Sequence, residues 1–166
     1  GGGMLVSDDT QGLKKVLKWI TQSREPALNY QHEELGYNYR MSNVVAGIGR
    51  GQMSVLEKRI EQKTKIFNTY KKEFSKIPAV SMMPDAGYGK NNNWLSCLLI
   101  DKESRVLPTQ IINKLSDENI ESRPVWKPMH LQPFYKSCDF FSHNDDESVS
   151  DDIFNRGICL PSDTNM

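Results

Sequence analysis

The groups best suited to bind an anion lie together in the segment GYNYRMSN, residues 36–43. The Arg40 guanidinium is a bidentate donor for phosphate or carboxylate, and the Asn38 amide adds an orientable donor two residues away. Ser42 or Asn43 is suited to cap a following helix, whose unpaired N–H groups and dipole also favour an anion. The segment therefore predicts an anion-binding turn. A capped turn with two packed tyrosines is the alternative.

A second candidate site is the segment 124–143, which is rich in proline and aromatic residues. Proline lacks an N–H donor, so the segment cannot be a regular element throughout. A shaped loop that lies against a pocket or an interface is expected instead. Arg123, Lys127 and His130 converge on this loop, and Arg and Lys suit a diphosphate-linked ligand. A purely structural aromatic loop with exposed charges is the alternative.

The elements around the first segment are predicted from the spacing of apolar residues. Residues 4–7 predict a short strand, and residues 10–22 carry one apolar helical face. From 53 to 77 apolar residues recur at helical spacing without Pro or Gly, and Pro78 ends the run. We therefore expect one long helix over 42–78 that connects two domains.

A small α/β domain is expected to hold the aromatic loop. Residues 94–101 predict a buried strand, 108–119 a helix and 120–123 a strand edge. The strand, helix, strand order favours an α/β layer. The predicted division of the chain is 1–41 for the end of a larger domain, 42–78 for the connecting helix and 79–166 for the small domain, incomplete at its end.

The composition argues against several classes of partner. Lys and Arg number 21 and Asp and Glu number 21, so the formal net charge is zero, which disfavours a nucleic-acid or anionic-membrane partner. No apolar run approaches the length that spans a bilayer. Cys97, Cys138 and Cys159 form no Cys-x-x-Cys pair, so no metal site is predicted. Cys97 and Cys159 lie in apolar runs and are expected to be buried thiols in a reducing compartment.

Four blocks of the sequence, in order, resemble the DegT/StrS family of pyridoxal-phosphate (PLP) dependent aminotransferases, which act on nucleotide-linked keto sugars. The blocks are GGGMLVSDD at 1–9, GYNYRMSN at 36–43, SRPVWKPMHLQP at 122–133 and GICLPS at 157–162. The third block is similar to that of C4-aminating, perosamine-synthase-like members. The resemblance spans nearly the whole chain. It implies an α/β fold, the C-terminal part of a fold-type I PLP aminotransferase, with a long interdomain helix and a small α/β domain.

The resemblance implies supporting rather than catalytic residues in this chain. The lysine that forms the Schiff base with PLP would precede Gly1, so no catalytic residue is expected and this fragment alone is predicted to be inactive. Asn38 would reach the PLP phosphate of the neighbouring subunit in a homodimer, with Arg40 as a second donor. Most other contacts with the cofactor would lie outside this fragment. The implied substrate-binding residues are Arg123, Trp126, Lys127, Met129 and His130.

The implied reaction transfers an amino group, from glutamate, to C4 of a UDP- or GDP-linked 4-keto-6-deoxy sugar. The product would enter surface glycan biosynthesis, and the enzyme would be cytoplasmic. The sequence WKPMH at 126–130 favours amination at C4 over C3.

Two other interpretations stay open at this point. A non-catalytic homologue, or a binding and dimerisation module, would lack the Schiff-base lysine altogether. A sugar dehydratase built on the same fold would carry histidine in place of that lysine, although WKPMH argues against it.

Overall fold

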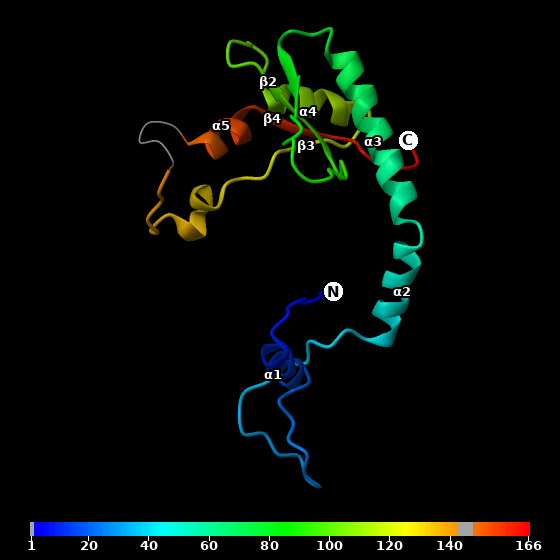
Figure 1. The fold of residues 1–166 in the computed structure, drawn as a ribbon. Helices are drawn as coiled ribbons and strands as arrows, with labels where there is room; N and C mark the ends of the chain where they lie inside the picture. Colours follow the sequence, from blue (N-terminus) through cyan, green and yellow to red (C-terminus); the bar gives the residue numbers. More distant parts are fainter. Residues whose placement is uncertain (1, 143–147) are drawn as a thin grey trace. The chain divides into compact units, whose positions relative to one another are not determined.

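The computed structural model describes residues 2–142 and 148–166. The chain divides into two compact units, Gly1–Leu56 and Glu57–Met166. The helices and strands, in chain order, are α1 Thr10–Ile20, α2 Asn43–Met53, α3 Leu56–Phe74, β1 Val80–Met82, β2 Ser96–Ile100, α4 Pro108–Asp117, β3 Arg123–Pro124, the 3-10 helices η1 Met129–Leu131 and η2 Pro133–Tyr135, α5 Val149–Arg156 and β4 Gly157–Leu160 (Figure 1).

Helix α1 organises the first unit. The helix predicted over 10–22 is confirmed, and the Asp9 carboxylate caps it by accepting the N–H groups of Gln11 at 3.1 Å and Gly12 at 2.9 Å. The chain then folds back against the end of α1. The N–H of Tyr37 donates to the Trp19 carbonyl at 2.6 Å. The segment 36–43 is therefore held at the C-terminal end of this helix.

The strand predicted at 4–7 does not form. Met4 and Val6 are 89% and 82% exposed. A strand needs a neighbour to pair its backbone N–H and C=O groups, and the described residues of the first unit offer none. The prediction was wrong because the apolar pattern reports suitability for a sheet and not the presence of a pairing partner.

The helix predicted to run unbroken over 42–78 is two helices. α2 ends at Met53, and Ser54 Oγ donates to the Gly51 carbonyl at 2.8 Å. The Val55 N–H donates to the Gln52 carbonyl at 3.2 Å, three residues back instead of four. Serine competes for backbone carbonyls in this way, and each glycine in α2 costs about 1 kcal/mol of helix propensity. The division between the two units falls after Leu56, so all of α3 except its first residue belongs to the second unit.

A four-stranded antiparallel sheet, in the order β1-β2-β4-β3, organises the second unit. The strand predicted over 94–101 is β2, and the helix predicted over 108–119 is α4, which begins at Pro108. The strand edge predicted at 120–123 is found as β3, which begins only at Arg123 and lies at the edge of the sheet. It pairs with β4, which follows β3 in sequence but lies between β2 and β3 in the sheet.

One face of the sheet carries the core of the second unit. Leu98 and Ile100 of β2 and Ile158 and Leu160 of β4 pack against side chains of α3 and α4. A cavity of about 1010 Å³, lined mainly by apolar residues, remains on this face. Side chains alternate along a strand. Cys97 and Cys159 are next to these core residues in β2 and β4, so their side chains belong to the opposite face of the sheet.

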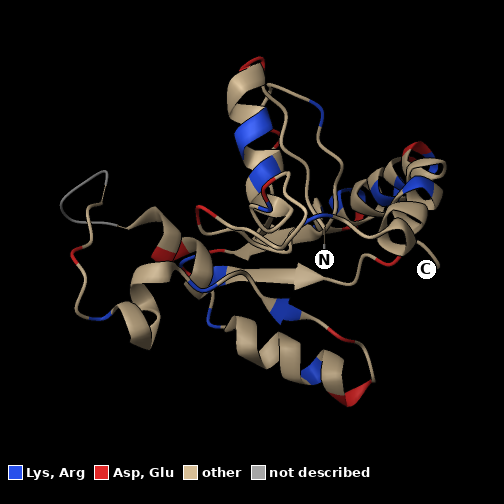
Figure 2. Cartoon of the chain, turned by 90° about the horizontal axis from the view of Figure 1, so that it is seen from below, with Lys and Arg blue, Asp and Glu red and all other residues tan. Residues whose placement is uncertain are grey.

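Charged residues of both signs are spread along the helices and loops (Figure 2). In the part of the chain that the structure describes, no helix combines the length and the apolar character that crossing a bilayer requires. Among the same residues, no three His, Cys, Asp or Glu side chains are grouped so that they could bind a metal ion.

Candidate functional site

The first candidate site is a cavity of about 720 Å³ in the first unit. Asn38, Arg40 and Ser42 line it together with residues from the N-terminal segment and from α1. Ser42 is the N-cap of α2, and its Oγ accepts the N–H of Val45 at 3.3 Å. The capping predicted from sequence is therefore present. The N-cap of α2 therefore lines the same cavity as Asn38 and Arg40.

The alternative interpretation of this segment predicted packed tyrosines, and these are present too. The rings of Tyr37 and Tyr39 stack with their centroids 5.0 Å apart. Within residues 2–142 and 148–166, neither the Asn38 amide nor the Arg40 guanidinium enters a hydrogen bond or ion pair between side chains or from side chain to backbone. Both groups are therefore donors without a protein acceptor at the edge of a cavity. A phosphate group fits such a donor set.

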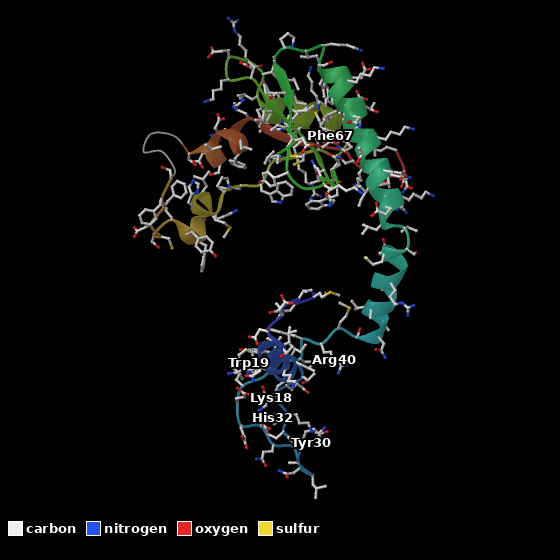
Figure 3. All side chains as sticks on the ribbon, viewed as in Figure 1. Lys18, Trp19, Tyr30, His32, Arg40 and Phe67 are labelled. Carbon is white, nitrogen blue, oxygen red and sulfur yellow. The ribbon has the colours of Figure 1, made fainter. Side chains whose placement is uncertain are left out.

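The loop 23–35 is held against α1 by polar contacts (Figure 3). Lys18 lies 2.5 Å from a Glu25 oxygen and 3.2 Å from a Glu34 oxygen. Trp19 Nε1 donates to Glu34 at 3.0 Å, and this bond, followed by that from Lys18, lowers the pKa of the Glu34 carboxyl. His32 Nδ1 lies 2.8 Å from the Gln22 carbonyl. The ring is therefore tied to the backbone, and no catalytic role follows from its position.

The second candidate site is a cavity of about 680 Å³ on the side of the sheet that carries Cys159. Three of the predicted substrate-binding residues line it, namely Arg123, Trp126 and Lys127. Arg123 is in β3, and the other two follow in the aromatic loop. The sequence therefore predicted a group of side chains that the structure brings to one cavity.

Trp94 is a further residue of this site that was not predicted from the sequence. Trp94 also lines the cavity, and its ring lies 5.9 Å from that of Trp126, tilted by 34°. Both rings are largely exposed. Trp94 was expected only as the first residue of a buried strand, and its position two residues before β2 was the one available signal. Its partner comes from a segment distant in sequence, so the pairing could not be predicted.

Arg123 already has a partner in the protein. Its Nε donates to Glu121 Oε1 at 2.8 Å, and a terminal nitrogen contacts the same oxygen. Both side chains are exposed, and exposed ion pairs contribute about 1 kcal/mol or less. An incoming phosphate can therefore compete with Glu121 for the guanidinium. The ion pair with Glu121 therefore does not exclude Arg123 as a candidate donor to a ligand, and binding of substrate by Arg123 stays a prediction.

Met129 and His130, the other two predicted substrate-binding residues, do not line this cavity. His130 Nε2 lies 2.7 Å from Asp151 Oδ1 at the start of α5. The imidazole also stacks on Phe140, with the ring centroids 3.6 Å apart. Met129 is 61% exposed on the same short helix, η1. His130 therefore connects the aromatic loop to α5, and binding of substrate by either residue stays a prediction.

Comparison with known proteins identifies the family. The DegT/DnrJ/EryC1/StrS aminotransferase family matches residues 1–166. Over 166 residues the chain is 46% identical to a putative pyridoxal phosphate-dependent aminotransferase, EpsN, of Bacillus subtilis (strain 168), covering 100% of this chain and 42% of that protein. Over 162 residues it is 33% identical to GDP-perosamine synthase of Escherichia coli O157:H7, covering 97% of this chain and 42% of that protein.

Solved structures show the fold. The aminotransferase PseC of Helicobacter pylori, involved in the biosynthesis of pseudaminic acid, matches with a TM-score of 0.80 at 18% identity, over 96% of this chain and 43% of that one. The PMP form of the putative sugar aminotransferase Spr1654 of Streptococcus pneumoniae matches with a TM-score of 0.82 at 19% identity, over 99% and 41%.

The chain thus spans less than half the length of the relatives it matches. Its fold is that of part of a fold-type I aminotransferase, which confirms the fold class predicted from the sequence. The match to the family covers every residue from 1 to 166. The chain belongs to the DegT/DnrJ/EryC1/StrS aminotransferase family.

Proposed function

We propose that this chain is part of a PLP-dependent aminotransferase that acts on a nucleotide-linked sugar. The reaction moves an amino group from glutamate to C4 of a UDP- or GDP-linked 4-keto-6-deoxy sugar, for surface glycan biosynthesis in the cytoplasm. The observation that carries the proposal is the family match over residues 1–166. The GDP-perosamine synthases among the relatives support a nucleotide sugar as substrate.

Asn38 and Arg40 are the residues of this chain that would hold the cofactor. The phosphate of PLP needs several donors, and the two side chains supply an amide and a guanidinium beside the capped N-terminus of α2. When bound, PLP acts as the electron sink that allows the amino group to be transferred. In the proposed homodimer, the phosphate held by this chain belongs to the cofactor of the neighbouring subunit. The lysine that carries the cofactor lies outside residues 1–166, so this chain alone is inactive.

The second cavity would bind the nucleotide sugar. Arg123 and Lys127 supply positive charge for the diphosphate, and Trp126 supplies an aromatic face for a ring of the ligand. Met129 and His130 stay in the proposal as residues near the sugar end. Because neither lines the cavity, they would act there only after the aromatic loop has adjusted.

The test uses the full-length protein that contains this chain. It is loaded with PLP and incubated with glutamate and either a UDP- or a GDP-linked 4-keto-6-deoxy sugar, and the products are identified by mass spectrometry. A 4-amino sugar formed with only one nucleotide would support the proposal and assign the nucleotide. A protein that binds no PLP and yields no amino sugar would overturn it in favour of a non-catalytic binding module.

A further inference from the structure

Two of the three cysteines lie directly opposite each other in the sheet. Cys97 is in β2 and Cys159 is in the adjacent antiparallel strand β4, and the two are Cα partners in the register. Both are free thiols. They are 62 residues apart in sequence, and their Sγ atoms are 3.5 Å apart. The fold has therefore brought two distant thiols into contact without bonding them.

The backbone at this position already suits a disulfide. Directly opposite residues in antiparallel strands have Cα atoms about 4.5–5.5 Å apart, and disulfides span about 4.4–6.8 Å between Cα atoms. Closing the S–S bond to its usual length of about 2.05 Å therefore asks for movement of side chains and not for a new strand register. Cross-linking is compatible with the folded sheet.

The thiol pair belongs to the sheet face that carries the second cavity. Cys159 is one of the residues that line this cavity, and Cys97 is half-buried. Leu98 and Ile158, which follow and precede them in the strands, are in the apolar core on the other face. Cys138, by contrast, is exposed and lies in the aromatic loop. A small oxidant that enters the cavity can therefore reach Cys159, the partner of Cys97, without unfolding the core.

We propose that Cys97 and Cys159 are a site of reversible oxidation, where a peroxide converts the two thiols into a cross-strand disulfide on the cavity face of the sheet. In the first step a thiolate sulfur attacks the O–O bond of hydrogen peroxide, which gives a sulfenic acid and hydroxide. In the second step the other sulfur attacks the sulfenic sulfur, the S–S bond forms, the S–O bond breaks and water leaves. Two thiols together lose two electrons and two protons, and one peroxide becomes two waters.

The environment of Cys97 sets the conditions for this reaction. Burial, followed by the hydrogen bond with Cys159, raises the pKa of the Cys97 thiol to about 12. The thiolate is the reactive form, so this sulfur is a poor nucleophile at neutral pH and becomes a better one as the pH rises. Oxidation that begins at Cys97 is therefore slow at neutral pH and becomes faster as the pH rises.

A disulfide between Cys97 and Cys159 would also lie at the candidate substrate cavity. Arg123 of β3 is the Cα partner of Cys159 on the far side of β4, and both residues line the cavity. The disulfide would link β2 to β4 at the position next to this arginine. The inference does not depend on the proposed amino transfer, because it rests on the register and the two thiols alone.

The experiment treats the fully reduced, folded protein that contains this chain with hydrogen peroxide near neutral pH and at mildly alkaline pH. Remaining thiols are then alkylated, and the digested protein is mapped by mass spectrometry without reduction. We expect a peptide pair joined between Cys97 and Cys159 and lighter by two hydrogen atoms than the separate peptides. The joined pair should accumulate faster at the higher pH and disappear after dithiothreitol.

Two variants provide matched controls. Cys138→Ser removes the exposed thiol and should leave the joined pair unchanged, whereas Cys159→Ser should abolish it. Recovery of Cys97 and Cys159 as alkylated or singly oxidised residues after peroxide treatment of the unmutated protein would overturn the inference. A disulfide that instead joins Cys138 to either of them would overturn it as well, since that product requires the aromatic loop to leave its position.

Discussion

Asp152 and Arg156 lie one turn apart in α5 and form a two-point ion pair that also reaches the sheet. Arg156 Nε donates to Asp152 Oδ1 at 2.8 Å, and a terminal nitrogen donates to Oδ2 at 2.5 Å. Arg156 Nη1 donates to the carbonyl of Ile100, the last residue of β2, at 2.7 Å. The pair therefore ties α5 to the strand that carries Cys97.

This ion pair predicts a loss of stability in acid. The hydrogen bond from Arg156 lowers the pKa of the Asp152 carboxyl in the folded protein. A group with a depressed folded-state pKa stabilises the fold fully above its unfolded pKa, about 3.9, and loses that contribution as the pH falls further. We expect Asp152→Asn to lower the free energy of unfolding at pH 7 by about 1 kcal/mol, because both side chains are partly exposed.

Urea unfolding at pH 7 and at pH 3 measures this effect. The difference between the unmutated protein and Asp152→Asn should shrink at the lower pH, because below about pH 3.9 the unfolded chain takes up a proton at Asp152 that the folded protein resists. Asp117→Asn is the matched control, since Asp117 is an exposed residue at the end of α4. An equal loss at both pH values would show that the charge of Asp152 does not contribute.

Gly36 predicts a second effect, in the first unit. A Cβ atom built at this position would lie 2.3 Å from the backbone nitrogen of Ser23 and 2.3 Å from the carbonyl carbon of Gln22. Because backbone atoms cannot move aside cheaply, Gly36→Ala should destabilise the unit by about 1–3 kcal/mol. Gly47→Ala is the control, because nothing lies within 4 Å of its Cβ position in α2.

The two glycine variants should change stability in opposite directions. Alanine at position 47 should stabilise α2 by about 0.5–1 kcal/mol, since glycine is the weaker helix former. Denaturant unfolding followed by circular dichroism and by Trp19 fluorescence measures both. If Gly36→Ala left the unfolding midpoint unchanged, the close packing of residues 36–43 against residues 22 and 23 would be contradicted.

The local patterns in the sequence predicted the elements that depend on near neighbours. The apolar face at Leu13, Val16 and Ile20 and the cap at Asp9 determine α1, and Pro108 marks the start of α4. Each of these signals acts within a few residues, so one sequence is sufficient to identify it. The family resemblance supplied the fold class, which the neighbours confirm.

The features that depend on strand order could not be predicted. Pairing of β3 with β4, contact between Cys97 and Cys159, and the pairing of Trp94 with Trp126 all require the register of the sheet. The strand expected at 4–7 does not form for a related reason, since a short stretch of sequence does not specify which strand it will pair with. Asn38 and Arg40 could be predicted to lie together because both belong to one short segment, and both line the first cavity; their role in binding stays a prediction.

Because His130 contacts Asp151, mutating each of the two residues distinguishes two roles for His130. If the histidine acts by holding the aromatic loop to α5, Asp151→Asn and His130→Ala should raise the KM for the nucleotide sugar by similar factors, with little change in kcat. The increase should be about tenfold or less, because a partly exposed contact between such groups contributes about 1 kcal/mol or less. A histidine that touches the substrate would give the loss in His130→Ala alone. The contact at 2.7 Å and the stack on Phe140 favour the first outcome.

Steady-state kinetics with the full-length enzyme distinguishes these cases, and proteolysis gives a second measurement. Both variants should increase cleavage within residues 126–141 if the loop is released from α5. Asp139→Asn is the control, because it neutralises an exposed carboxylate on the same loop. Unchanged cleavage in both variants would contradict the positioning role.

The last prediction concerns Arg40 and the cofactor phosphate. Arg40 lines the first cavity together with Ser42 and has no acceptor among the described residues, so its guanidinium is available to the phosphate that we propose it binds. A charge-assisted hydrogen bond contributes about 1.5–3 kcal/mol, so Arg40→Ala should weaken PLP binding by the full-length protein about tenfold or more. Asn38→Ala should weaken it less, because the amide carries no charge.

Arg50 provides the matched control for Arg40, since it is an exposed arginine in the last turn of α2. Titration with PLP, followed by absorbance, should give an unchanged dissociation constant for Arg50→Ala. Mixed dimers supply a sharper test of the proposed arrangement across the interface. When Arg40→Ala is combined with a subunit that cannot carry PLP, the cofactor on the Arg40→Ala subunit should bind normally, because its phosphate contacts the partner's arginine. Weakened binding in that mixed dimer would place Arg40 at the cofactor of its own subunit instead.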